Sequence, residues 1–362
     1  MQSEDLVPTS KRSRRPVVAV TGAASGLGRE LLARLVTSAD FRRVVAIDEE
    51  RGDVQEATWR VIDVRDPLLA NRMSDIDVVV HLAGDYALDS DPRERRAYNL
   101  RAAQTVLTAS AAARVRRVVL VTSAMVYGAA PDNDVPLAED APVAAEPDTG
   151  VVGDYLEIEA LVRRSLRSHP GLEVTVLRPA AIVGPGVDTV ITRHFESPRL
   201  LTVKGCTQRW QFCHIDDLLS ALELAAKGAV TGVAAVGCDG WLEQDQIEEL
   251  SGIRPFELPA GLTFGTAQRL HRLGITPAPA TDLHYVVYPW VVDCAGLREA
   301  GWKPSWTNEA AFVQLLELRE NRTTVVGRRL PVKEATLTAA GATVAVIGTA
   351  AIVHQVRKKR RT

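Results

Sequence analysis

The sequence has no lysine between Lys11 and Lys204, although the chain is 362 residues long. Cysteine is also scarce: the four cysteines lie far apart and form no CxxC pair, which excludes a disulfide framework and argues against a zinc site. The formal net charge is -2 and charged residues make up 24% of the chain, which excludes a globally basic nucleic-acid binder and a disordered chain. We therefore expect a globular protein with reduced thiols and no metal, in the cytoplasm.

Short aliphatic runs alternate with helix-length segments through the first half of the chain. Residues 1–15 come before them and lack an apolar period, which predicts a disordered basic tail. The runs are Val17–Val20, Arg43–Ile47, Val78–Leu82, Arg117–Val121 and Val174–Leu177, and the first is too short for the core of a secretory signal. Their alternation with helical segments predicts βαβ units and a buried parallel sheet.

The regular pattern fades after Pro185, where prolines begin to punctuate shorter elements. We therefore expect an α/β protein with two parts. Residues 16–185 are predicted to form a Rossmann-type, doubly wound parallel sheet that binds NAD. Residues 186–325 are predicted to form a smaller C-terminal substrate lobe, with room for elements that return to the first domain.

The segment 335–356 carries no formal charge unless His354 is protonated, and a basic cluster, Arg357–Arg361, follows it. A bilayer core takes roughly 20 apolar residues, so this segment is a candidate membrane-associated helix whose basic end would contact anionic headgroups. The alternative is a small-residue helix or tail without membrane contact. A basic terminus beyond the segment does not fit the positive-inside rule for a cytoplasmic protein, and both alternatives stay open.

A glycine-rich turn, TGAASGLG over residues 21–28, follows the first predicted strand. Glycine has no Cβ and lets the backbone approach a pyrophosphate, while the next helix directs its N-terminal N–H groups at the phosphates. The second predicted strand ends in Asp48, twenty residues after Gly28. A carboxylate there accepts hydrogen bonds from the ribose hydroxyls of NAD and repels the 2′-phosphate of NADP, so we predict NAD. The alternative is that the glycines only form a tight turn.

The spacing of this turn resembles that of the short-chain dehydrogenase/reductase superfamily, specifically its extended branch, the NAD-dependent epimerase/dehydratase family, in actinobacterial members. Further motifs support the resemblance over about residues 16–320: Asp63-Val64, His81-Leu-Ala-Gly84, Asn99, Thr122-Ser123, Arg178-Pro179, His214-Ile-Asp-Asp217 and Gly301-Trp302. The resemblance implies an oxidoreductase or isomerase that acts on a nucleotide sugar or a related hydroxylated substrate.

The resemblance also implies which residues bind the cofactor. By this resemblance, the glycine turn would wrap the pyrophosphate, Asp63 and Val64 would border the adenine, and Ala83 and Gly84 would lie along the other half of the cofactor. Asp63 could instead cap the next segment, and Ala83 and Gly84 could be small for packing. The complete predicted set is Gly22, Ser25, Gly26, Leu27, Gly28, Asp48, Asp63, Val64, Ala83, Gly84, Asn99, Tyr155 and Pro179.

By the same resemblance, Ser123 and Tyr155 are the predicted catalytic residues. In the family, hydride passes between a carbinol carbon and the nicotinamide, the tyrosine exchanges the hydroxyl proton, and the serine binds the same oxygen. A lysine four residues after the tyrosine lowers its pKa, but Glu159 stands at that position here. Helical spacing predicts Glu159 on the face of Tyr155, where a carboxylate would raise the phenol pKa. Two alternatives follow: an NAD-dependent enzyme, or an NAD-binding regulatory or scaffold protein with a degenerate site.

Two further expectations concern partners. The resemblance implies a homodimer through the helices that carry Asn99 and Tyr155, and an apolar stripe serves either this contact or packing on the sheet: Ala102, Ala103, Leu107 and Ala111. By the resemblance, three arginines fall where relatives meet a nucleotide-sugar diphosphate, and the alternative is that they are ordinary surface arginines: Arg193, Arg199 and Arg209.

Overall fold

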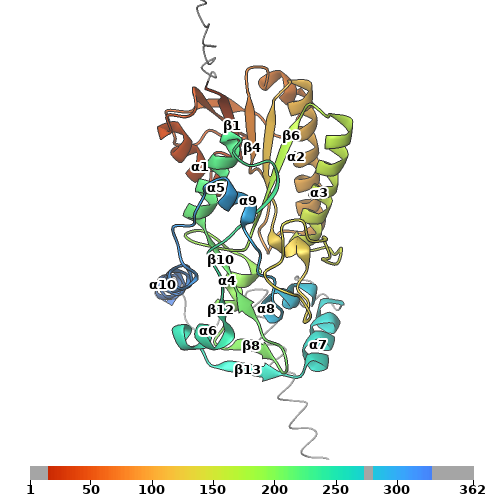
Figure 1. Ribbon diagram of the computed structural model, residues 1–362, viewed down its shortest axis with the longest axis vertical. Coiled ribbons are helices and arrows are strands. Elements are labelled where there is room, and N and C mark those ends of the chain that lie inside the picture. The colour runs from red at the N-terminus through yellow and green to blue at the C-terminus, as the bar shows by residue number, and fades with distance from the viewer. Residues whose placement is uncertain (1–14, 273–279, 328–362) are drawn as a thin grey trace, which may run out of the picture.

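The computed structural model describes residues 15–272 and 280–327. The candidate membrane segment 335–356 and nearly all of the predicted N-terminal tail lie outside these residues. Within the described ranges, no helix combines the length and the apolar character needed to cross a bilayer. Figure 1 shows an upper part built around a sheet and a lower part of short helices and strands.

Seven parallel strands form the central sheet, in the order β11-β6-β5-β4-β1-β2-β3. Five of them match the predicted runs: β1 (Val17–Thr21), β2 (Arg43–Asp48), β4 (Val78–His81), β5 (Arg117–Val121) and β6 (Glu173–Pro179). The two edge strands are β3 (Thr58–Val61) and β11 (Gly232–Val236). The aliphatic pattern does not show β3, because this edge strand is partly exposed. The predicted doubly wound parallel sheet is confirmed.

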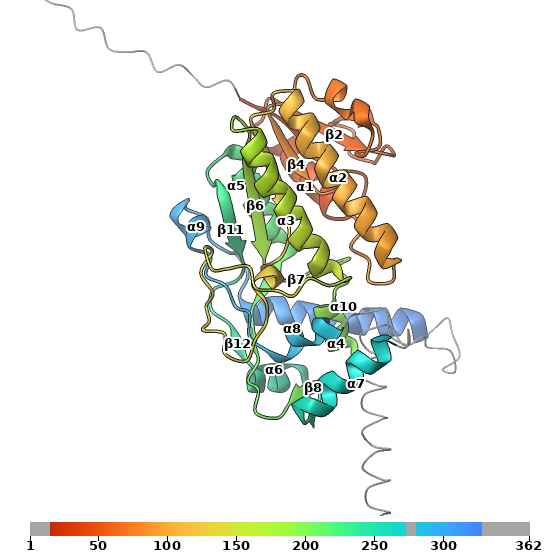
Figure 2. The same cartoon turned by 90° about the vertical axis from the view of Figure 1, so that its right-hand side faces the viewer.

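The alternation of side chains on β1 explains why the sheet has two covered faces. Val18 and Val20 pack into one core with α1 (Gly26–Thr37) and α5 (Ile215–Lys227). Val17 and Ala19 belong to the other core, with α2 (Pro92–Ala112), α3 (Val151–Ser168) and the short 3-10 helix η1 (Pro67–Arg72). Figure 2 shows α2 and α3 side by side over that face.

The predicted apolar stripe on α2 lies against the sheet. Ala102, Ala103 and Leu107 are buried within the chain, so these side chains are not available to a second copy. A homodimer stays a prediction, and it would have to use other side chains of α2 and α3.

The second part of the chain is assembled from short elements. Three strand pairs occur: β7 (Ala181–Val183) with β10 (Phe212–His214), β8 (Leu200–Val203) with β13 (Pro255–Leu258), and β9 (Arg209–Trp210) with β12 (Leu242–Glu243). The helices are α4 (Val190–Glu196), α6 (Gln244–Ser251), α7 (Ala260–Arg272), η3 (Ala280–Leu283), α8 (His284–Val287), α9 (Ala295–Glu299) and α10 (Asn308–Gly327). A cluster of four aromatic side chains fills its core: Phe195, Trp210, Phe212 and Phe312.

Two elements from residues 186–325 complete the first domain. β11 pairs in parallel with β6, and α5 packs against α1. The sheet therefore reaches its full width only after the chain has begun the second lobe. The carboxyl ends of β1, β2, β4, β5 and β6 meet at one edge of the sheet, which is where open α/β sheets bind ligands.

Candidate functional site

The turn between β1 and α1 can be built only with glycine at two positions. Gly22 has a φ of +68°, and a Cβ there would lie 2.7 Å from the backbone nitrogen of Ala83. A Cβ on Gly28 would lie 1.9 Å from the carbonyl oxygen of Gly22. The turn and the first residues of α1 line a cavity of about 680 Å³. The backbone can therefore approach a ligand closely at the positive end of a helix, as a pyrophosphate requires.

Asp48 lies at the carboxyl end of β2 and lines the same cavity. Its Oδ2 accepts the N–H of Ala24 at 2.9 Å, and its Oδ1 accepts the N–H of Glu49 at 2.7 Å. These two bonds fix the carboxylate beside the glycine turn. Val64, Ala83 and Gly84 line this cavity as well. The residues present therefore fit NAD, whose phosphates would lie at the N-terminus of α1 and whose adenosine ribose would lie at Asp48.

The carboxyl end of β4 lies directly beside the glycine turn, because β4 pairs with β1. His81 lines the cavity, and its Nδ1 lies 2.8 Å from Oγ1 of Thr21. Burial lowers the pKa of His81 to about 4, so the ring is neutral at neutral pH. The Tyr86 ring lies directly over Gly84, where a Cβ would be only 2.3 Å from the ring. Gly84 thus makes room for a tyrosine that the motif-based prediction did not include.

Three of the predicted cofactor residues stand outside the lining of this cavity: Asp63, Asn99 and Pro179. The Asp63 carboxylate bonds to Nε of Arg65 at 2.9 Å, and this contact lowers the Asp63 pKa. Pro179 ends β6. Their roles in cofactor binding stay predictions.

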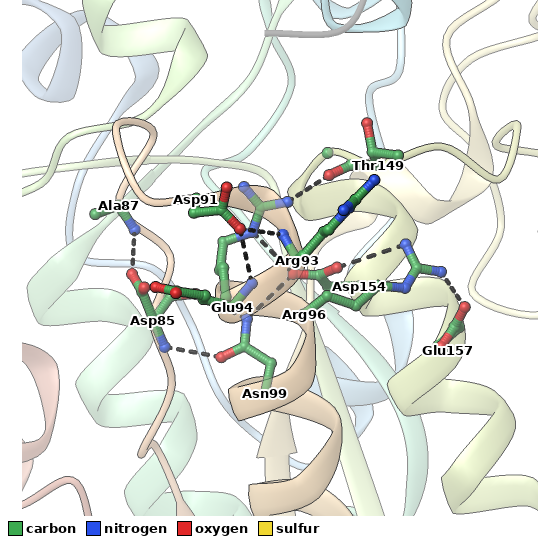
Figure 3. A network of polar contacts seen from close by, with 12 residues as sticks. Asp85, Ala87, Asp91, Arg93, Glu94, Arg96, Asn99, Thr149, Asp154 and Glu157 are labelled. Carbon is green, nitrogen blue, oxygen red and sulfur yellow. Dashed lines mark hydrogen bonds and ion pairs between the residues drawn. The ribbon is translucent and has the colours of Figure 1, made fainter. Parts of the chain in front are cut away.

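Asn99 belongs instead to a polar network that joins α2 to the start of α3 (Figure 3). Its side chain accepts the N–H of Asp85 at 2.8 Å and donates to the carbonyl oxygen of Asp85 at 2.7 Å. It also donates to Asp154 at 3.2 Å, and Arg95 donates to the same carboxylate at 2.9 Å. Asp154 is fully buried, so this network fixes the residue that precedes Tyr155.

Ser123 and Tyr155 line a second, smaller cavity of about 100 Å³. Ser123 follows β5, and its Oγ accepts the N–H of Met125 at 3.1 Å, where it caps the 3-10 helix η2 (Ala124–Tyr127). Tyr155 stacks on Tyr86 with ring centroids 5.4 Å apart. The two cavities share six lining residues: Tyr86, Thr122, Tyr155, Ile182, Asp188 and Thr189. The structure thus brings the two predicted catalytic residues to the boundary of the predicted cofactor cavity.

Glu159 faces away from both cavities, which corrects the expectation that it acts on Tyr155. Its carboxylate accepts hydrogen bonds from Nε and Nη2 of Arg178, at 2.9 and 2.5 Å, and from Thr122 at 2.9 Å. The pKa of Tyr155 is raised above its ordinary value, mainly by burial and then by Tyr86 and Asp154. Glu159, which stands in the position of the family's lysine, therefore forms a buried ion pair with Arg178 on β6.

Three residues that the sequence did not predict line the small cavity with Ser123 and Tyr155: Tyr86, Asp188 and Asp282. Tyr86 follows the motif His81–Gly84 by two residues, and Asp188 follows the glycine-containing segment Gly184–Gly186 by two residues, so the loops after these segments could have been searched. Asp282 lies in η3, far along the chain and outside any motif, and no local signal could have found it. Trp290 is buried and lines the small cavity as well.

Asp282 gives a testable dependence of stability on pH. Burial raises its pKa to about 8, Asp148 adds to this effect, and Arg95 opposes it. The folded state then holds this proton more tightly than the unfolded chain, so the stabilisation is present below the unfolded pKa of ~4 and is lost as pH rises through about 8. Between about pH 6 and about pH 9, the melting temperature of Asp282→Asn should therefore fall less than that of the wild type. Exposed Asp134→Asn is the control, and parallel curves for wild type and Asp282→Asn would contradict the assignment.

Comparison with known proteins agrees with this geometry. Residues 18–236 match the NAD dependent epimerase/dehydratase family. An uncharacterized protein of Mycobacterium tuberculosis is 33% identical over 312 residues, which is 82% of each chain. A 4-hydroxy-2-methyl-3-oxo-4-farnesyl-3,4-dihydroquinoline-1-oxide ketoreductase of Stigmatella aurantiaca is 27% identical over 294 residues, 74% of this chain and 85% of the relative.

Solved structures share the fold. The enzyme WbmG of Bordetella bronchiseptica, in complex with NAD and UDP, is 22% identical with a TM-score of 0.61 and covers 87% of this chain and 96% of its own. The prediction of NAD as the cofactor is confirmed. With a glycine turn, an acid at the end of β2 and a family match over more than half of its length, the chain belongs to the NAD-dependent epimerase/dehydratase family.

Proposed function

We propose that this protein transfers hydride between NAD and the carbon that bears a hydroxyl or carbonyl oxygen, with Ser123 and Tyr155 at that oxygen. One observation supports the proposal above all others. Ser123 and Tyr155 line a single cavity, and this cavity adjoins the one that contains the glycine turn and Asp48. Hydride transfer needs the two reactants in contact, so the substrate and cofactor sites have to meet.

The protonation state of Tyr155 favours one direction of the reaction. Because its pKa is raised, the phenol keeps its proton at neutral pH and acts as a donor. Ser123 accepts the N–H of Met125, which orients its own O–H for the same substrate oxygen. Bound NADH supplies the hydride from C4 of its nicotinamide. Tyr155 then donates the proton to the oxygen of the reduced carbon, so a ketone plus hydride plus proton gives an alcohol.

Two substrate classes are compatible with this chemistry. The Bordetella structure holds UDP, which favours a nucleotide sugar or a related hydroxylated compound. The Stigmatella relative is named as a ketoreductase of a farnesylated ring system, which favours a ketone. An epimerase would use the same residues twice, since it removes hydride and returns it to the other face.

A second candidate function is that of an NAD-binding regulatory or scaffold protein. The observation that favours it is the arrangement of Glu159, which binds Arg178 and leaves no ammonium group one helical turn after Tyr155. The family's usual activation of the tyrosine is then missing.

Titration of NADH with the full chain separates these possibilities. Both functions predict saturable binding, seen as enhanced NADH fluorescence. The oxidoreductase also predicts NADH oxidation when ketones are added, whereas the regulatory protein predicts binding without turnover over the whole panel of nucleotide sugars and ketones. Failure to bind NADH would contradict both.

Asp48 should determine the choice between NADH and NADPH. The Asp48→Asn variant keeps the shape but loses the charge, so we expect NADH to bind roughly tenfold more weakly and discrimination against NADPH to drop by a similar factor. Fluorescence titration with both nucleotides measures this. Glu49→Gln is the matched control, because Glu49 is the neighbouring acid on the same cavity. An unchanged ratio of the two affinities in Asp48→Asn would show that the ribose binds elsewhere.

A further inference from the structure

The small cavity beside Ser123 and Tyr155 is mainly apolar. The side chains around it include Leu88, Met125, Val152, Ile182, Ile191 and Trp290. Among the described residues, no lysine or arginine lines this cavity or the larger one. The titratable acids that line the small cavity are Asp188 and Asp282. A ligand with a diphosphate would therefore meet apolar walls and two carboxyl groups.

Arg193, which binds the lining residue Asp188, has its donors already engaged. Arg193 on α4 donates from Nε and Nη2 to Asp188, at 2.8 and 2.7 Å, and from Nη1 and Nη2 to Asp89, both at 2.9 Å. Its side chain is 5% exposed. With two carboxylates around one guanidinium, the group carries a net negative charge. The alternative of an ordinary surface arginine is wrong, and the arginine is also not presented to a diphosphate.

Asp282, which also lines the cavity, offers a different kind of contact. It is 8% exposed, and the ionisable groups that act on it are Asp148, Arg95 and, from the neighbouring turn, Tyr285. Burial raises its pKa to about 8, so at neutral pH the carboxyl group is mostly protonated. A protonated carboxyl donates a hydrogen bond to a neutral oxygen, whereas a diphosphate needs cations or several N–H donors.

We propose that this cavity takes an uncharged, largely apolar ketone or alcohol and excludes nucleotide sugars, with the Asp282 carboxyl hydrogen-bonded to a neutral oxygen of the ligand. This inference rests on the proposed hydride transfer, because it concerns the substrate of the same site. The apolar walls stabilise the hydrocarbon part by burial. The net negative charge of the Asp188–Arg193–Asp89 group disfavours an anionic ligand by like-charge repulsion in a partly buried site.

The test compares trans-1-decalone with UDP-glucose as probes on the full chain loaded with NAD. Tryptophan fluorescence reports binding, because Trp290 lines the cavity, and Trp290→Phe shows which part of the signal comes from it. We expect saturable quenching by decalone, with an affinity at least roughly tenfold higher than that for UDP-glucose. Tighter binding of UDP-glucose, or binding of neither probe, overturns the proposal.

The role of Asp282 has a separate readout in the pH dependence of decalone binding. Since deprotonation removes the donor, the wild-type affinity should fall roughly tenfold between about pH 7 and about pH 9. Asp282→Asn keeps an N–H donor at all these pH values and should bind decalone with little change, while Asp282→Leu should bind it weakly throughout. A pH profile that is the same in wild type and Asp282→Asn contradicts the role of Asp282.

These results can be told apart from failure of the proposed function. If UDP-glucose binds and is turned over with reduction of NAD, the hydride transfer stands and the substrate class proposed here falls. If NADH does not bind, the proposed function itself fails, whatever the tryptophan signal shows.

Discussion

Replacement of Glu159 by lysine is expected to destabilise the protein by about 3–5 kcal/mol and to give no gain in hydride transfer. Glu159 is 3% exposed and accepts two hydrogen bonds from the equally buried Arg178. A lysine would leave the Arg178 guanidinium buried without its partner and would add a second positive charge beside it. The variant restores the family's sequence motif, but its ammonium group would replace a side chain that lines neither the NAD cavity nor the small cavity.

Urea unfolding of matched variants measures this effect. Glu159→Gln removes the charge but keeps the shape, and it should lie between the wild type and Glu159→Lys. The double variant Glu159→Leu/Arg178→Met replaces both members of the pair and should be much more stable than Glu159→Lys, since apolar replacement of a complete buried pair is often close to neutral. A Glu159→Lys protein as stable as wild type, with a higher rate of NADH oxidation, would falsify this account of Glu159.

Replacement of Tyr155 by phenylalanine is expected to lower the rate of NADH oxidation with a ketone by about 10² to 10⁴-fold. The phenol is the proposed proton donor, and phenylalanine removes only its O–H. The stack on Tyr86, with centroids 5.4 Å apart, needs only the ring, so stability and NADH binding should stay close to the wild type. The combination of a lost rate with retained binding distinguishes a catalytic from a packing role.

Tyr86→Phe is the matched control for this experiment, because it removes the hydroxyl from the other ring of the same stack. We expect its rate to stay within about threefold of the wild type, since Tyr86 has no assigned proton transfer. Ser123→Ala should lie between the two, because it removes a hydrogen bond to the substrate oxygen but not the proton donor. Turnover of Tyr155→Phe at the wild-type rate would remove Tyr155 from the mechanism.

Local sequence patterns were sufficient to predict much of the fold and the cofactor half of the candidate site. The five aliphatic runs predict β1, β2, β4, β5 and β6, because a strand covered on both faces has to be apolar along its whole length. The turn from Gly22 to Gly28 and the acid Asp48 follow from requirements that are local in the chain. These features could be predicted because neighbouring residues impose them.

The two edge strands of the sheet were harder to predict, because the pattern of neighbouring residues does not identify them. β3 is an edge strand with partly exposed side chains, so its apolar pattern is weak. β11 pairs with β6 although more than fifty residues separate them, and α5, which precedes β11, packs against α1. Asn99 is one of the motif residues predicted to bind the cofactor, yet its side-chain amide forms hydrogen bonds with Asp85 and Asp154.

The sequence by itself determined the α/β class, the family and NAD as the cofactor, because each depends on residue types at short, fixed spacings. It also showed that glutamate, and not lysine, stands four residues after Tyr155. Only the tertiary structure decided what that substitution means, since the partner of Glu159 is Arg178 on β6, nineteen residues away, and no spacing rule names it. In the same way, Asp282 reaches the cavity of Ser123 and Tyr155 only through folding of the second lobe, where long-range packing sets both its position and its protonation.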